Sequence, residues 1–208
     1  MGWANRITIA RGALALLLWG VLHVIDVYPD LGPSAWWFAF ALFVVTASTD
    51  SLDGYIARRR GEVSVFGRIA DPFVDKLLIL GSMIFLLGIP GIVQAMPPWT
   101  VAVTLGRELL VTTLRSAVEA AGGNFQAGGW GKWKMGFQCV AIGAVLFYGA
   151  GVPWVRAPIW DAAPGDPVHG GWNLARLVCV SAALVTAGSG VEYTMRALRL
   201  LRAGGRGS

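Results

Sequence analysis

The amino-acid sequence predicts an all-α integral membrane protein with six transmembrane helices. Three observations support this fold class: 55% of the residues are hydrophobic, only 14% are charged, and the mean hydropathy is +0.60. A soluble domain usually carries about 25% charged residues. A chain of 208 residues has the length of one domain, so we expect residues 1–208 to form a single membrane domain.

Six apolar runs give the predicted helices: residues 7–27, 35–49, 73–89, 99–121, 135–152 and 174–198. A membrane crossing needs about 20 mostly apolar residues, and backbone polar groups in lipid must be satisfied within the segment, which favours helices. The second run is short, but its helical pattern continues through residues 50–59. The first run is long and carries Arg11, so we expect a retained helix and not a cleaved signal peptide.

The segments between these runs differ in charge on the two sides. One side comprises segments 28–34, 90–98 and 153–171, where the only arginine or lysine is Arg156. The other side carries Arg6, four arginines in 58–68, two lysines in 131–134, and Arg196, Arg199, Arg202 and Arg206. The excess of basic residues predicts that this side, with both termini, lies in the cytoplasm. The net charge of +5 is therefore expected to meet anionic lipid head groups and not nucleic acid.

Four aspartates form two pairs at the predicted cytoplasmic ends of the second and third helices. Asp50 and Asp53 are three residues apart and Asp71 and Asp75 are four apart, so each pair shares one helix face. The two helices run in opposite directions, so the pairs can meet. Four neighbouring carboxylates need a countercharge, and Mg²⁺ suits carboxylates together with a substrate phosphate. The spacing therefore predicts a polar metal site near the cytoplasmic face.

The residues between the two pairs also fit a phosphate ligand. Gly54, Ala57 and Gly67 are small enough for a ligand or a neighbouring helix to approach the backbone closely. Arg58 lies one turn beyond Gly54, and its planar guanidinium suits a phosphate.

Residues 50–75 also resemble a known family. They read DSLDGYIAR, then eight residues, then GRIADPFVD. This is similar to the signature of the CDP-alcohol phosphatidyltransferases, D-x-x-D-G-x-x-A-R, eight residues, G-x-x-x-D-x-x-x-D, and all eight fixed positions match. The resemblance implies a multi-pass homodimeric enzyme of the cell (inner) membrane that uses CDP-diacylglycerol, with its active site facing the cytoplasm.

The resemblance also implies a role for each motif residue. Asp50, Asp53, Asp71 and Asp75 would bind two Mg²⁺ ions, with Mn²⁺ as the alternative, and Asp75 would also be the general base. The cytidine nucleotide would be bound by Asn5, Thr8, Arg11, Asp50, Gly54, Ala57, Arg58, Ser64 and Gly67. Asn5 and Thr8 lie at the start of the first predicted helix, where they could equally be helix caps.

Four basic residues further along the chain are candidates for binding the acceptor alcohol: Arg107, Arg115, Lys132 and Lys134. Such a cluster suits an acceptor that bears a phosphate. In the alternative interpretation, Arg107 pairs locally with Glu108 or an aspartate, and the lysines contact lipid head groups. The segment GRELLVTTLR at 106–115 and GKWK at 131–134 resemble the branch of the family whose acceptor is glycerol 3-phosphate and whose product is phosphatidylglycerophosphate. Met135 stands where that branch usually has threonine.

Other functions stay open from the sequence. The same chemistry could use inositol phosphate, inositol or serine as the acceptor. A cation transporter would distribute its acids across the depth of the membrane, whereas these acids lie at one predicted face. A purely structural scaffold explains none of the acids. Cys139 and Cys179 both fall in apolar helices and indicate neither a disulfide nor a zinc site.

Overall fold

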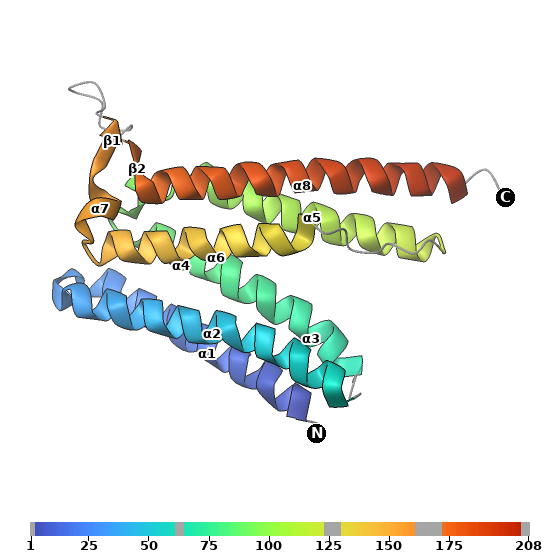
Figure 1. Ribbon diagram of the computed structural model, residues 1–208, viewed down its shortest axis with the longest axis horizontal. Helices are drawn as coiled ribbons and strands as arrows, with labels where there is room; N and C mark the ends of the chain where they lie inside the picture. The colour runs from blue at the N-terminus through green and yellow to red at the C-terminus, as the bar shows by residue number, and fades with distance from the viewer. Residues whose placement is uncertain (1–2, 61–64, 123–129, 161–171, 205–208) are drawn as a thin grey trace.

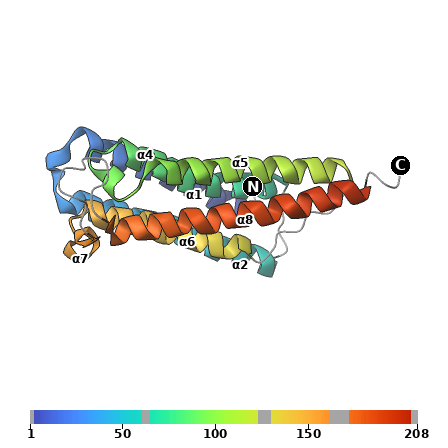
Figure 2. The same cartoon turned by 90° about the horizontal axis from the view of Figure 1, so that it is seen from above.

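The structure, a computed structural model, describes residues 3–60, 65–122, 130–160 and 172–204, and most of them are helical (Figures 1 and 2). The helices are α1 (Trp3–Val27), α2 (Pro33–Arg60), α3 (Val65–Lys76), α4 (Ser82–Gly88), α5 (Pro98–Ala120), α6 (Trp130–Gly149), α7 (Pro153–Arg156) and α8 (Leu174–Gly204). A π-helical segment, η2 (Leu77–Gly81), joins α3 to α4. Two 3₁₀ turns, η1 (Pro29–Leu31) and η3 (Ile92–Gln94), and strands β1 (Pro158–Trp160) and β2 (Trp172–Asn173) complete the fold.

Each of the six predicted runs is helical over most of its length, as expected. Within the described residues, two segments have both the length and the apolar composition of a membrane-crossing helix, Ile7–Val27 of α1 and Leu174–Leu200 of α8. The apolar part of α2, Pro33–Thr49, is shorter. Helix α5 carries Arg107, Glu108 and Arg115 among its apolar residues, because it contributes charged groups to the interior of the bundle, as shown below.

The outside of the bundle is strongly apolar. Leu16, Val140 and Leu184 are 59%, 60% and 63% exposed, whereas several hydroxyl side chains are fully buried. The Thr46 hydroxyl donates to the Leu42 carbonyl at 2.7 Å, so it needs no partner beyond its own helix. Contiguous exposed apolar surface is rare on soluble monomers, and this pattern is suited to lipid as the surrounding solvent.

The helices pack in two groups that meet along α2 and α6 (Figure 1). Helix α1 lies against α2, α3 and α4, and α8 lies along α5 and α6. The core where the groups meet includes fully buried Leu18, Leu86 and Leu146. Helices α2 and α6 approach closely at one end, because Gly149 leaves room for the Trp36 ring, which a Cβ at residue 149 would overlap.

The predicted connection at 153–171 contains α7 and β1, which the sequence did not indicate. Strand β1 pairs antiparallel with β2, with Pro158 opposite Asn173. Asn173 then caps α8: its Oδ1 accepts from the Arg176 backbone N–H at 2.9 Å, and its Nδ2 donates to the Gln94 carbonyl at 3.2 Å. Both chain termini lie toward the opposite end of the bundle (Figures 1 and 2).

We expect Asn173→Ala to destabilise the protein, because it removes the cap of α8 and the hydrogen bond from Asn173 Nδ2 to the Gln94 carbonyl. Loss of a cap alone costs about 1–2 kcal/mol. The thermal unfolding midpoint in detergent micelles measures the effect. Asn173→Asp, which keeps the capping oxygen and loses the amide donor, should fall between wild type and Asn173→Ala. Ser34→Ala, at an exposed hydroxyl, should leave the midpoint unchanged. An unchanged midpoint in Asn173→Ala would contradict the cap.

Candidate active site

Two of the four predicted metal-binding aspartates contact the first helix. Asp71 and Asp75 lie one turn apart on α3, and Arg11 Nη2 on α1 is 3.2 Å from Asp75 Oδ1 and 3.7 Å from Asp71 Oδ1. The Thr8 hydroxyl donates to Asp71 Oδ1 at 2.6 Å. The Arg11 side chain is 1% exposed and that of Asp71 is 48% exposed. The buried guanidinium of Arg11 therefore holds the two partly exposed carboxylates side by side. The Thr8 hydroxyl contacts the carboxylate of Asp71 as well.

This arrangement fits a divalent cation. The oxygens of Asp71 and Asp75 lie close enough together to share one guanidinium nitrogen, and carboxylate oxygens are the ligands that Mg²⁺ prefers. Asp50 and Asp53 fall in the last part of α2, where the structure describes the helix but not these side chains. Among the described residues, no group of three His, Cys, Asp or Glu side chains lies together as a metal site, so the four-carboxylate site stays a prediction.

A second charged cluster lies between α5, α6 and α8, with Glu108 at its centre. Glu108 Oε1 accepts from Arg107 Nη1 at 3.2 Å and from Lys134 Nζ. Arg107 Nε donates to the Ser189 hydroxyl of α8 at 3.1 Å, and its guanidinium lies 5.1 Å from the centre of the Tyr193 ring. All three charged side chains are about nine-tenths buried. One carboxylate thus serves two buried cations, which leaves a net positive charge.

A cavity of about 170 Å³ brings the two clusters together. Four charged side chains line it: Asp75, Lys76, Glu108 and Lys134. The rest of the wall is polar at Gln138 and apolar at Pro72, Ile79, Leu80 and Met135. The predicted general base and one predicted acceptor-binding lysine therefore line the same cavity, although they are 59 residues apart in the sequence. A cavity with two ammonium groups and two carboxylates, one of them the predicted base, suits a small phosphorylated alcohol.

Lys76 and Gln138 were not among the predicted site residues and also line this cavity. Lys76 Nζ donates to the Thr112 hydroxyl, which itself donates to the Glu108 carbonyl at 2.7 Å. Gln138 Nε2 donates to the Thr186 hydroxyl of α8 at 3.3 Å. Gln138 is one turn from Lys134, so helical spacing could have identified it. Lys76 follows Asp75 directly, and adjacent helical residues point to different sides, so spacing gave no signal for it.

The other two described acceptor candidates lie outside the cavity wall. Arg107 faces α8 through Ser189 and Tyr193, and its contact with Glu108 matches the alternative in which it pairs locally. Arg115 is half-buried, about 12 Å further along α5, and its Nε is buried without a hydrogen-bond partner among the described residues. The structure therefore brings Lys134 to Asp75, and does not bring Arg107 or Arg115 into the same cavity.

The remaining predicted residues are placed only by their helices. The structure describes the helix but not the side chain at Asn5 in α1, at Gly54, Ala57 and Arg58 in α2, at Gly67 in α3 and at Lys132 in α6. Ser64 lies outside the described residues. Their roles in nucleotide and acceptor binding stay predictions.

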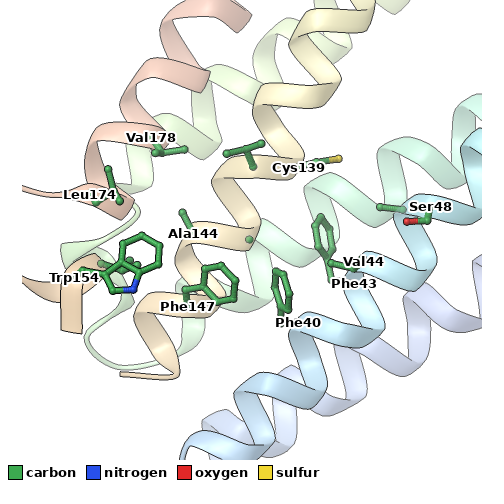
Figure 3. Close-up of a pocket in the computed structure, with 14 residues that line it drawn as sticks. Phe40, Phe43, Val44, Ser48, Cys139, Ala144, Phe147, Trp154, Leu174 and Val178 are labelled. Atoms are coloured by element: carbon green, nitrogen blue, oxygen red, sulfur yellow. The ribbon is translucent and has the colours of Figure 1, made fainter. Parts of the chain in front are cut away.

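An apolar groove of about 530 Å³ lies beside the middle of α2 (Figure 3). It runs between α2, α6 and α8, from Ser48 and Cys139 past Phe40 and Phe147 to Trp154. Ser48 is two residues before Asp50 on α2. The groove therefore leads from near the aspartate motif along α2 and α6 toward α7 at the other end of the bundle, and its apolar lining suits hydrocarbon.

Fold and site together define a class of protein. A bundle of apolar helices that gathers carboxylates and buried cations around a small cavity at one end is typical of a membrane enzyme that acts on phosphorylated substrates.

Comparison with known proteins identifies the family within that class. The family model of the CDP-alcohol phosphatidyltransferases matches residues 1–161, so the chain belongs to the CDP-alcohol phosphatidyltransferase family. A CDP-diacylglycerol–glycerol-3-phosphate 3-phosphatidyltransferase of Bacillus subtilis is 34% identical, over 76% of this chain and 83% of its own length. The protein of that name from Cereibacter sphaeroides is 33% identical, over 82% of this chain and 86% of its own length.

We expect Glu108→Gln to destabilise the protein, because two buried cations would lose their shared countercharge. Removal of one partner from a buried ion pair costs about 3–5 kcal/mol. The unfolding midpoint in detergent measures the effect, and Glu119→Gln is the matched control at an exposed site on the same helix. Replacing Lys134 by Met in the Glu108→Gln background should recover part of the loss, because it removes one of the unpaired cations. A wild-type midpoint for Glu108→Gln would show that the pairing contributes nothing.

Proposed function

We propose that the protein transfers the phosphatidyl group of CDP-diacylglycerol to glycerol 3-phosphate, giving phosphatidylglycerophosphate and CMP. The observation that carries the proposal is the cavity shared by the Asp75 carboxylate and the Lys134 ammonium. The reaction requires a base for the acceptor hydroxyl and a cation for the acceptor phosphate. The names of the two relatives point to the same donor and acceptor.

In the proposed mechanism Asp75 accepts the proton of an acceptor hydroxyl. The hydroxyl oxygen forms a bond to the lipid-side phosphorus, and the bond from that phosphorus to the CMP oxygen breaks, so that CMP leaves with the electron pair. Arg11 holds the Asp75 carboxylate from the α1 side, and Lys134 holds the acceptor phosphate from the α6 side. Asn5, Thr8, Gly54, Ala57, Arg58, Ser64 and Gly67 are proposed to surround the nucleotide.

Asp50, Asp53, Asp71 and Asp75 are the residues that would hold two Mg²⁺ ions, or Mn²⁺ in their place. The convergence of the Asp71 and Asp75 oxygens supports this assignment. When bound, such ions neutralise a diphosphate and stabilise the negative charge that develops on the transferred phosphoryl group.

For the acceptor phosphate, Lys134 has the strongest support, because it shares the cavity with Asp75. Lys132, two residues earlier, and Arg115 are proposed to extend the basic surface toward the entrance. Arg107 is proposed to act on the phosphate site through Glu108, which it shares with Lys134.

The proposed setting is the cell (inner) membrane, with six helical crossings, both termini in the cytoplasm and the catalytic cavity on the cytoplasmic side. Three features support this orientation: both termini lie toward the same end of the bundle, the exterior is apolar, and the basic residues gather in the segments of one predicted side. The groove between α2, α6 and α8 is proposed to hold an acyl chain of the lipid donor. A homodimer is proposed from the family resemblance alone.

We expect Asp75→Asn to abolish release of CMP from CDP-diacylglycerol while the protein stays folded, because an amide cannot accept the acceptor proton. Chelation of divalent cations should abolish the activity of the wild type, and added Mg²⁺ should restore it. Asp30→Asn, at an exposed turn at the other end of the bundle, is the control and should behave as wild type. Normal turnover in Asp75→Asn would exclude Asp75 as the base.

We expect glycerol 3-phosphate to give the fastest CMP release in a panel with glycerol, serine, inositol and inositol phosphate. Lys134→Gln should raise the KM for glycerol 3-phosphate at least about tenfold, because a charged hydrogen bond is worth roughly 1.5–3 kcal/mol. Arg176→Gln, at the other end of the bundle, serves as the control for loss of a positive charge. A strong response to serine or inositol with none to glycerol 3-phosphate would overturn the acceptor assignment.

A further inference from the structure

The helix that carries Asp75 changes its winding directly after the site. Leu77–Gly81 forms a π-helix that starts two residues after Asp75. A π turn contains one more residue than an α turn, so it rotates the part of the helix before it relative to the part after it. Ile79 and Leu80, within this segment, line the same cavity as Asp75 and Lys76. The π segment therefore sets both the direction of the carboxylate and the shape of the wall beside it.

The indole of Trp19 fills the space beside Gly81 at the end of this segment. A Cβ built on Gly81 would overlap the indole ring. The ring also stacks on Phe85 of α4, with the centroids 5.4 Å apart and the planes at 20°. The Trp19 Nε1 is buried and has no hydrogen-bond partner among the described residues. Packing against the glycine and Phe85 therefore holds the indole in place.

Helix α1 thus contacts the continuous α3–η2–α4 helix on both sides of the π segment. Arg11 contacts Asp75 before the segment, and Trp19 contacts Gly81 at its end. Arg11 and Trp19 are eight residues apart on α1, which is about 12 Å along the helix axis. Because both contacts come from one helix, they fix how far the chain from Asp75 to Gly81 advances and how far it rotates.

We propose that Trp19 and Gly81 are positioning residues for Asp75, and that the indole–glycine contact keeps the π segment in the register that aims Asp75 into the cavity opposite Lys134. The inference rests on the proposed function, in which Asp75 takes the acceptor proton. If the contact is lost, the carboxylate is still present but turns relative to the bound acceptor, while Lys134 on α6 stays in place.

The test compares full-length Gly81→Ala, Trp19→Leu and their double variant with wild type in the same lipid vesicles. The matched control is Gly88→Ala on α4, where the atom nearest to the added methyl group is Asp26 Oδ2 at 3.9 Å, an ordinary contact. CMP release gives kcat and the KM for glycerol 3-phosphate. Hydrogen–deuterium exchange of the Leu77–Gly81 amides reports on the π segment independently of turnover.

Gly81→Ala should lower kcat about a hundredfold, since a displacement of about 1 Å at a reacting group has that effect. Its KM should stay within about threefold of wild type, because the phosphate site is unchanged. Amide exchange of the π segment should be faster. Gly88→Ala should match wild type, and the double variant should recover at least about tenfold of the lost kcat, because the smaller leucine leaves room for the methyl group and the original register can return.

A wild-type kcat and wild-type exchange in Gly81→Ala would overturn the inference, as would a double variant no better than Gly81→Ala. If Gly81→Ala does not fold, Trp19→Leu decides: a lower kcat at unchanged KM supports the inference, and a wild-type kcat overturns it. If wild type releases no CMP with any acceptor, the proposed function fails. The exchange rates then still decide whether Trp19 and Gly81 set the π segment.

Discussion

The structure depends on one constraint: charged side chains inside an apolar helical bundle must have partners within the bundle. Two clusters of buried charged side chains satisfy this constraint in different ways. Arg11 is fully buried and contacts the partly exposed carboxylates of Asp71 and Asp75. Glu108 is buried and contacts Arg107 and Lys134. An unpaired charge at either place would cost several kcal/mol. These pairings therefore determine which helices can meet around the small cavity.

The two clusters belong to different groups of helices. Arg11 joins α1 to α3, and Glu108 joins α5 to α6, with Ser189 and Tyr193 of α8 completing the contacts of Arg107. The small cavity lies where the groups face each other, and each group supplies one of its charged walls. A change in how the groups pack therefore changes the distance between the carboxylate of Asp75 and the ammonium of Lys134, which is the distance that a bound acceptor has to span.

Helix positions and the spacing of the aspartates could be predicted from the sequence, because apolar run length and helical periodicity are local properties. The contacts of Arg11 and Glu108 could not, since each depends on which helix lies opposite. The same holds for the π segment: nothing in Leu77–Gly81 distinguishes it from an α-helix, and the tertiary contact of Gly81 with Trp19 is needed to recognise it. The cluster of four basic acceptor residues was likewise derived from spacing along the chain, whereas the structure separates Arg107 from the cavity.

The charge of the Glu108 cluster bears on the choice of acceptor. The cavity wall contains two lysines, Lys76 and Lys134, and two carboxylates, Asp75 and Glu108. Glu108 also contacts Arg107, which lies outside the wall, so one carboxylate is divided between Lys134 and a second buried cation. An acceptor with a phosphate brings negative charge next to the two lysines in a region of low dielectric, where its attraction to them is stronger than in water. A neutral acceptor such as inositol gains no such attraction. It also carries no charge that could compete with Glu108 for Lys134, so the sharing of Glu108 favours a phosphorylated alcohol.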